Sequence, residues 1–385
     1  MRQQWWKVLA VAILVYALIA GLLVPLKPNL VAVSPTSAEL GSLQQFELLG
    51  YNTRFIDDAG TTNAWLNTST DRQLYSIEAE SVEVIDDRRA TVTFHLPPEN
   101  ADGELGQRKL SMIVTGAANG TFVVPGAVTV RQEEYVISDN ISGSSANWHP
   151  QALAAEDLYS NEAFTFPFRG LLSETIRNTY FHVSLWFAMM FLFIAAVVYA
   201  IKYLIRKSRY DRSSTLGGVA LTDITDLERA DNWSVVFTSV GTLFGVLGLL
   251  TGAVWAKYTW GSYWNWDIKQ FTTLIALLIY AGYFVLRAAF PDPEQRARLG
   301  AVYNIFAFAC LIPLIYILPR LSATSLHPGA DGNPALGGED LDNTMRMVFY
   351  PTIIGWTLFG GWMATVAYRS RVLGLKLVRR MDQSL

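Results

Sequence analysis

The sequence predicts a polytopic α-helical membrane protein with six transmembrane helices and one inserted extracytoplasmic all-β domain. Of its 385 residues, 51% are hydrophobic and only 16% are charged, a composition too apolar for an ordinary soluble protein of this size. Six stretches are long and apolar enough to cross a hydrocarbon core, which takes about 20 residues as a helix. Between the first two lies a long region with the alternating pattern of β-strands.

The six expected spans share long runs of Leu, Ile, Val, Phe and Ala with few charges. The first begins among Arg2 and Lys7, which is also the pattern of a secretory signal peptide. No small-residue cleavage site follows it, so we expect an uncleaved anchor over residues 1–26. The spans are residues 5–26, 180–202, 233–256, 270–290, 301–319 and 347–368.

Basic residues predict the orientation, because cytoplasmic loops of membrane proteins are enriched in Lys and Arg. Three basic groups follow the second span, surround the connection between the fourth and fifth, and follow the sixth. Both termini, including a basic tail at 371–385, are therefore expected in the cytoplasm of a bacterium, with the chain in its inner membrane. Residues 27–178, 257–269 and 320–345 would then face outward. The basic residues are Arg206, Lys207, Arg209, Arg212, Arg287, Arg296, Arg298, Arg369, Arg371, Lys376, Arg379 and Arg380.

The first outward region is expected to hold a periplasmic β-sandwich over residues 27–135. Short alternating runs such as FELLGY and RRATVTFHL are separated by Gly, Pro, Asn and Asp turn signals. The start of this region weakly resembles immunoglobulin-like domains of the IPT/TIG kind, without the Cys and Trp hallmarks of antibody domains. Residues 136–178 are expected to form a linker and a membrane-surface segment, partly helical over 151–172. Residues 208–232 are expected to form a cytoplasmic loop with one short helix.

Composition excludes several classes of function. The net charge of −3 and the short, scattered basic clusters argue against nucleic-acid binding. With Cys310 as its one cysteine, the chain has no C-x-x-C pair and no C-x-x-C-H site for covalent haem. The sequence also has no G-x-x-x-x-G-K-[ST] phosphate-binding loop.

The stretch WGSYWNWD, residues 260–267, is the main candidate functional motif. Tryptophan and tyrosine collect at membrane interfaces, but this density also suits an aromatic platform for a large planar apolar ligand. His182 and His327 are expected on the same outward side. Two imidazoles are common axial ligands of haem iron, so together with the tryptophans they favour haem over an interfacial belt.

These residues resemble the WWD-motif haem-handling family of cytochrome c maturation, and most closely its haem exporter protein C (CcmC) branch. In that family a W-G-x-x-W-x-W-D stretch lies between two histidine-bearing segments within a six-span core. The resemblance covers residues 1–25 and 175–370, so residues 179–370 are expected to complete the core. The matching residues are Trp255, Trp260, Gly261, Trp264, Trp266, Asp267, His182 and His327.

The resemblance implies a haem-delivery factor rather than an enzyme. It implies non-covalent haem b with His182 and His327 as axial ligands, covered by the motif's tryptophans and Tyr263. The haem would pass to a CcmE-like periplasmic haem chaperone, with ABC-type CcmA and CcmB and a CcmD-like subunit as further partners. Asp267 is expected mainly to cap the fourth span or orient the loop. The candidate partners of the haem propionates, with lipid headgroups as the competing choice, are Lys257, Lys269, Arg320 and Arg346.

Two departures leave alternatives open. The β domain has no counterpart in typical family members. The related CcsA and CcmF synthetases usually continue the motif as W-D-P-K-E, whereas this chain has Asp267-Ile268-Lys269-Gln270. A CcsA-like or CcmF-like part of a cytochrome c haem lyase is the first alternative. A membrane-anchored β-domain binding protein without haem is the second, and a small-molecule transporter is disfavoured because no span has a charged residue near its middle.

Overall fold

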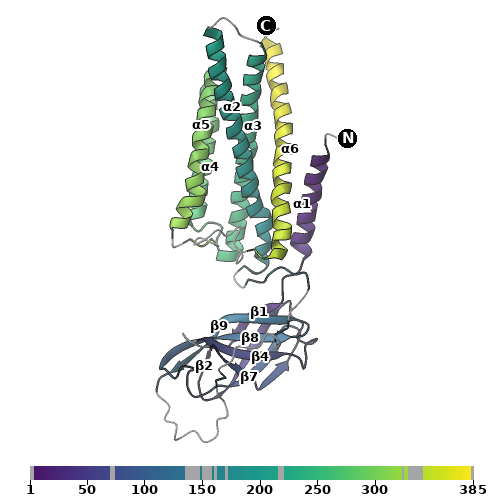
Figure 1. Cartoon of the computed structure of the whole chain (residues 1–385), viewed down its shortest axis with the longest axis vertical. Coiled ribbons are helices and arrows are strands. Elements are labelled where there is room, and N and C mark those ends of the chain that lie inside the picture. Colours follow the sequence, from purple (N-terminus) through teal and green to yellow (C-terminus); the bar gives the residue numbers. More distant parts are fainter. Residues whose placement is uncertain are drawn as a thin grey trace. The chain divides into compact units, whose positions relative to one another are not determined.

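The chain forms two compact units, a helical unit of residues 1–24 and 171–385 and a β unit of residues 25–170. Figure 1 shows the computed structural model, with the first helix in purple and the last in yellow. Part of the expected 136–178 linker, residues 136–147, 150–157, 160–162 and 170–171, lies outside the described residues. The structure describes residues 4–69, 74–134, 148–149, 158–159, 163–169, 172–215, 221–322, 325–327 and 341–382.

The described part of the β unit holds nine strands in two sheets. One sheet has the order β1-β3-β7-β6 and the other the order β2-β9-β8-β4-β5. Neighbouring strands are antiparallel except for β2 and β9, which are parallel. The strands are β1 (Asn29–Ser34), β2 (Ser37–Ala38), β3 (Leu43–Tyr51), β4 (Asn63–Ser69), β5 (Leu74–Glu78), β6 (Ser81–Val84), β7 (Arg89–His95), β8 (Gly106–Gly116) and β9 (Gly120–Gln132).

Alternation along the strands builds one core between the two sheets. In β3, Phe46 and Leu48 are fully buried while Glu47 between them is exposed. Leu110 and Met112 of the other sheet belong to the same buried cluster. Each such side chain contributes roughly 1.5–3 kcal/mol by leaving water. The β-strand pattern in the sequence therefore corresponds to real sheets, and the immunoglobulin-like relationship stays a prediction.

The chain enters and leaves the β unit along paired segments. Leu26 and Phe166 form a parallel bridge, in which the Lys27 N–H donates to the Phe166 carbonyl at 2.6 Å. In the helical unit, Arg177 Nη1 donates to the carbonyl of Val24 at 2.6 Å, at the point where the first helix ends. Residues 163–169 are extended, so the helix expected within 151–172 is wrong for them, because Phe166 is fully buried in this bridge.

The helical unit contains six long helices and four shorter turns among the described residues. Five segments are long and apolar enough to span a membrane, which makes the chain a multi-pass membrane protein: Trp5–Leu23, Ser173–Ser214, Ile224–Trp260, Ile268–Ala289 and Pro293–Leu321. The sixth expected span lies inside α6, whose Gly, Trp and Thr residues make it less apolar, and it stays a prediction. The elements are α1 (Trp5–Leu23), η3 (Ser173–Arg177), η4 (Thr179–Val183), α2 (Ser184–Thr215), α3 (Leu221–Trp260), α4 (Ile268–Ala289), α5 (Pro293–Ile312), η5 (Pro313–Ile317), η6 (Leu318–Leu321) and α6 (Asn343–Asp382).

The expected cytoplasmic loop over 208–232 is wrong, because α2 continues to Thr215 and α3 already begins at Leu221. At about 1.5 Å per residue, the 40 residues of α3 extend about 60 Å, twice the hydrocarbon thickness of about 30 Å. Ion pairs between helices support this polar extension. Arg379 of α6 pairs with Glu228 of α3 at 2.5 Å. Sequence periodicity missed these turns because they are polar on most sides.

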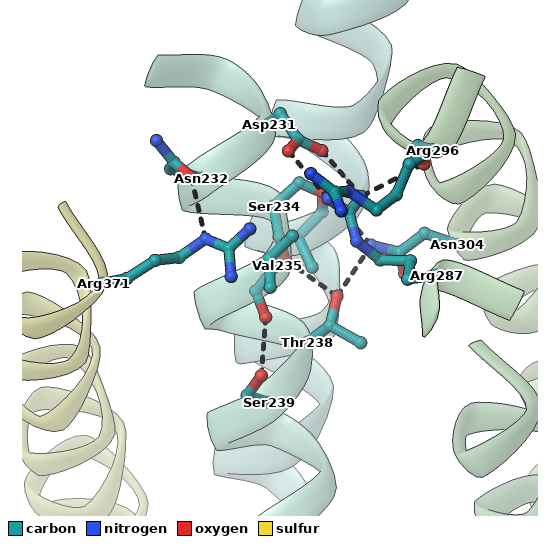
Figure 2. A network of polar contacts seen from close by, with 11 residues as sticks. Asp231, Asn232, Ser234, Val235, Thr238, Ser239, Arg287, Arg296, Asn304 and Arg371 are labelled. Carbon is teal, nitrogen blue, oxygen red and sulfur yellow. Dashed lines mark hydrogen bonds and ion pairs between the residues drawn. The ribbon is translucent and has the colours of Figure 1, made fainter. Parts of the chain in front are cut away.

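A polar network joins four helices at the end of α3 where Asp231 lies (Figure 2). Arg287 of α4 binds both carboxylate oxygens of Asp231, at 2.7 and 2.8 Å. Asn304 of α5 donates to Thr238 of α3 at 2.8 Å, and Arg371 of α6 donates to an α3 amide oxygen. Arg287 is 8% exposed and Asp231 15%. A bidentate pair with this burial fixes helix positions, since breaking it would leave a buried charge.

Candidate functional site

The WGSYWNWD motif forms the end of α3 and a defined loop over residues 261–267, before α4 begins. Gly261 and Trp266 both have positive φ, of +83° and +54°. Glycine adopts this region freely, whereas a bulky residue there is strained, and such strain gathers at functional sites. The Asn265 N–H donates to Gln270 Oε1 at 3.0 Å, which ties the loop to α4. The motif is thus neither one helix nor one strand.

The loop exposes aromatic rings without making a single flat surface. The rings of Trp264 and Trp266 lie 5.8 Å apart and are perpendicular, at 89°. Trp266 is 73% exposed and Tyr263 58%. The expected flat platform is therefore wrong for Trp264 and Trp266, because the positive φ of Trp266 turns its ring across its neighbour. Exposed and half-buried aromatic edges remain available at this end of the bundle.

Asp267 joins three parts of the site. Its side chain caps α4, as the sequence led us to expect, by accepting the Lys269 N–H at 2.8 Å. The same carboxylate accepts from the Leu326 N–H at 2.6 Å and the Ser325 hydroxyl at 3.0 Å. It also lies 2.7 Å from Nδ1 of His327. Its side chain is fully buried, so the carboxylate holds segment 325–327 against the loop.

The surroundings of Asp267 keep it ionised. Burial by itself would raise the pKa of this carboxyl, since a charge is less stable away from water. Hydrogen bonding and charge from His327, with the N–H groups of Leu326 and Lys269, outweigh burial and hold the pKa below its ordinary value of 3.8. Asp267 is therefore an anion at neutral pH that fixes the N–H of His327 on Nδ1 and leaves the lone pair on Nε2.

His327 is positioned from two sides. Besides Asp267, it contacts the ring of Trp260 edge-on, with centroids 4.9 Å apart. Its side chain is 23% exposed. A carboxylate that binds one imidazole nitrogen is found behind many metal-bound histidines.

His182 lies in η4, a single π-helical turn, a local irregularity that occurs often at functional sites. Its Nδ1 lies 3.1 Å from the Thr251 hydroxyl of α3. Trp186 donates its indole N–H to Nε2 at 3.3 Å. The imidazole contacts Trp255 edge-on, with centroids 5.7 Å apart. Close approach to α3 depends on Gly252, where a Cβ would lie 2.6 Å from the imidazole.

Both histidines lie along the last turns of α3. His182 contacts Trp255 and His327 contacts Trp260, five positions further on, which is about 7.5 Å along a helix. The structure thus brings together the two histidines and the motif, as the sequence suggested. Two imidazoles whose Nδ1 atoms each face an oxygen, with indole rings beside them, are residues of the type that can hold a haem. No cluster of three or more His, Cys, Asp or Glu able to hold a bare metal ion occurs among the described residues.

The candidate propionate partners are less well placed. Lys257 Nζ donates to the Gly261 carbonyl at 2.9 Å and lies 5.8 Å from the Tyr263 ring centroid. Arg320 is exposed in η6, and Arg346 donates to Asn343 at 3.3 Å. The backbone of Lys269 is engaged by the Asp267 cap. The role of these cations toward propionates stays a prediction.

Sequence reasoning missed Trp186, Thr251 and Ser325. Trp186 had a usable signal, since it lies four positions after His182 and hence on the same helical face. Thr251 and Ser325 carry no local signal, because their contacts depend on how distant segments pack.

Comparison with known proteins places these residues in a family. Residues 172–327 match the model of the cytochrome C assembly protein family. Heme exporter protein C of Bradyrhizobium diazoefficiens is 31% identical over 134 residues, which are 35% of this chain and 50% of that protein. Cytochrome c biogenesis protein CcsA of Spinacia oleracea is 46% identical over 101 residues, 26% of this chain and 30% of that protein. The CcsA of Synechococcus sp. is 35% identical over 116 residues, 29% and 36% of the two chains.

The chain spans half or less of the length of these relatives. The family match nevertheless contains His182, His327 and the complete 255–267 motif. Over residues 172–327, the chain is therefore similar to the cytochrome C assembly protein family.

Proposed function

We propose that the chain binds haem b non-covalently between His182 and His327 and presents it at the end of the bundle that carries the 261–267 loop. The observation that supports this most strongly is that the two imidazoles have the same kind of hydrogen-bond partner at Nδ1. An oxygen, from Asp267 or Thr251, faces Nδ1 of each ring, and each ring therefore directs Nε2 away from that oxygen. Haem supplies the iron for these nitrogens and a porphyrin edge for the later transfer.

The chain's own residues give the site its chemistry. Asp267 orients His327 and, as an anion, increases its electron donation toward a metal. Trp255 and Trp260, which contact the two imidazoles, exclude water from the porphyrin. The exposed loop residues Tyr263 and Trp266 leave one side of the site open, as a delivery site requires.

We further propose that this end of the bundle faces the periplasm and that a CcmE-like haem chaperone is the acceptor. The basic residues near the opposite helix ends support this orientation in the inner membrane, with both termini cytoplasmic. The β unit of residues 25–170 would then be periplasmic. A relative named heme exporter protein C supports delivery rather than catalysis as the role.

The relatives named CcsA favour a second candidate, a part of a cytochrome c haem lyase. The two candidates differ in the acceptor. Haem-loaded protein mixed with a haem chaperone should yield haem bound covalently to the chaperone's histidine if the delivery role is right. Haem attached to a C-x-x-C-H peptide of an apocytochrome, with no chaperone present, would favour the lyase.

The first test is the absorption spectrum of the detergent-purified chain, oxidised and reduced. We expect a low-spin, six-coordinate haem spectrum. In His182→Ala and in His327→Ala it should be lost or become five-coordinate at equal protein yield. His95→Ala is the matched control, since His95 faces Glu80 in the β unit.

A wild-type chain that carries no haem after growth in haem-replete cells, and that cannot be reconstituted, would contradict the proposal. Function would then have to lie in the β unit, as in a membrane-anchored binding protein.

A further inference from the structure

Both ring nitrogens of His182 are engaged by neighbouring side chains. Nδ1 lies 3.1 Å from Oγ1 of Thr251, and Nε2 accepts the indole N–H of Trp186 at 3.3 Å. An imidazole that is to bind iron through Nε2 must first lose the second of these contacts. The site as it stands therefore contains its own competitor for the ligand nitrogen.

The proton positions follow from the partners. The Thr251 hydroxyl donates back to the carbonyls of Leu247 and Gly248, at 2.9 and 3.0 Å. Its oxygen is then left to accept, so the proton of the neutral ring is on Nδ1 of His182. An indole N–H only donates, which requires the lone pair on Nε2. The two contacts thus agree on one tautomer, the one that iron ligation needs.

We propose that Trp186 is a gate on His182, and that Thr251 is the residue that sets the tautomer behind it. The inference rests on the proposed haem binding. It adds that the Trp186 N–H and the haem iron compete for Nε2 of His182. In the haem-free protein the Trp186 N–H satisfies Nε2. Haem can bind this nitrogen only after the indole releases it, so the contact lowers the affinity for haem.

The packing explains why the indole remains close. Trp186 lies one helical turn after His182, and Gly248 of α3 lets its ring approach so closely that a Cβ there would lie 2.8 Å away. The rings of Trp186 and His182 meet edge to face at 84°.

Trp255 provides a matched control within the same site. It contacts the same imidazole at 5.7 Å and 78°, but its N–H donates to the Thr175 hydroxyl at 3.0 Å. Trp255 and Trp186 therefore share residue type and neighbour. They differ in whether the N–H competes for His182.

The binding experiment titrates ferric haem into the full-length, haem-stripped chain in detergent, followed at the Soret band. Trp186→Phe keeps an aromatic ring and removes the competing donor. Because a hydrogen bond contributes about 0.5–1.5 kcal/mol net, we expect Trp186→Phe to bind haem about two- to tenfold more tightly than wild type. Trp255→Phe should bind no more tightly than wild type.

The second experiment determines the tautomer of His182 in the haem-free protein, by ¹⁵N NMR of labelled histidine. We expect wild-type His182 to be the Nδ1–H tautomer, with an Nε2 resonance that shifts in Trp186→Phe. In the Trp186→Phe background, where Nε2 no longer accepts the indole N–H, Thr251→Val should lose the tautomer preference and Thr251→Ser should keep it, a result that packing alone would not give.

The outcomes separate this inference from the function on which it rests. If wild type binds no haem, the proposed function fails. If wild type binds haem through His182 but Trp186→Phe binds it equally or more weakly, haem binding stands and the gate is wrong. An Nε2–H tautomer of His182 in the haem-free protein would also overturn the gate.

Discussion

At the scale of single residues, Asp267 carries the most connections in the candidate site. One buried carboxylate accepts from the backbone of Lys269 and Leu326 and faces His327. Its pKa is lowered in the folded chain, so ionisation favours the folded state. That stabilisation is complete above the ordinary pKa of 3.8 and disappears only as the pH falls through the lowered value. Around neutral pH the stabilisation by the Asp267 carboxylate does not change with pH.

We expect Asp267→Asn to weaken haem binding about 10- to 100-fold, the usual effect of losing a carboxylate behind a metal-bound imidazole. An amide carries no charge and accepts through one oxygen only, so it cannot serve all the donors around it. Haem titration measures the effect. Asp292→Asn is the control, since Asp292 also caps a helix, at 2.7 Å from the Gln295 nitrogen, but contacts no histidine. Equal losses in both variants would show that capping alone matters.

At the scale of elements, α3 acts as the wall against which His182 and Trp186 lie. Gly252 faces the imidazole and Gly248 faces the indole, each leaving too little space for a Cβ. Glycine costs an exposed helix interior about 0.5–1 kcal/mol relative to alanine. Here that cost is offset by a close contact between α3 and the histidine-bearing turn.

We expect Gly252→Ala to abolish the low-spin spectrum while leaving the protein folded. The new methyl group would lie 2.6 Å from Cε1 of His182, so the ring must move away from Thr251. The spectrum reports the ligation, and size-exclusion chromatography reports the fold. Gly361→Ala in α6, where a Cβ meets nothing within 4 Å, should keep the wild-type spectrum. An unchanged spectrum in Gly252→Ala would mean that His182 is not held against α3 when it binds haem.

At the scale of the whole molecule, the Asp231–Arg287 pair ties the helices together at the end of α3 away from the loop (Figure 2). Its burial distinguishes it from the exposed pair between Arg206 and Asp226, whose side chains are 43% and 50% exposed. Buried pairs matter chiefly because one partner alone leaves an uncompensated charge.

We expect Arg287→Met to destabilise the helical unit by about 3–5 kcal/mol, and the double variant with Asp231→Leu to recover most of this loss. Arg206→Met should cost less than about 1 kcal/mol, as exposed pairs usually do. Denaturant unfolding in detergent, followed by helical circular dichroism, measures all three. A double variant no more stable than Arg287→Met would contradict the role of the unpaired charge.

The sequence predicted the parts of this molecule that depend on local pattern. Hydropathy predicted the five described helical segments that are long and apolar enough to span a membrane, and alternation such as that around Phe46 in β3 predicted strands. The prediction of a loop failed over residues 208–232, where ion pairs such as that between Arg379 and Glu228 support polar turns of helix. Charge pairing between distant segments leaves no hydrophobic period to detect.

In the candidate site, too, the features that depend on local sequence were predictable and those that depend on packing were not. His182, His327 and the motif were found because their residue types are unusual and their topology is shared. The Asp267 cap was expected from its position before a span. The ring orientations were not, because the positive φ of Trp266 and the contacts of Thr251 arise from packing. Thus the residues of the candidate site were predictable and the geometry that holds them was not.

The paired entry and exit of the β unit predict that it can be removed. We expect replacement of residues 28–165 by a short Gly-Ser linker to leave the helical unit monodisperse, since the bridge between Leu26 and Phe166 already brings the chain ends together. Size-exclusion chromatography and the haem spectrum would test this. A deletion variant that aggregates while wild type does not would show that the helices need the β unit to fold.

The same feature has a consequence for how such a protein diversifies. A module whose two ends meet can be acquired, lost or exchanged in a genome without rerouting any helix. On the helical side, the hydrogen bond between Arg177 and the Val24 carbonyl joins the two segments that lead into and out of the β unit. Selection on what the β unit recognises can then proceed independently of selection on the residues around His182 and His327.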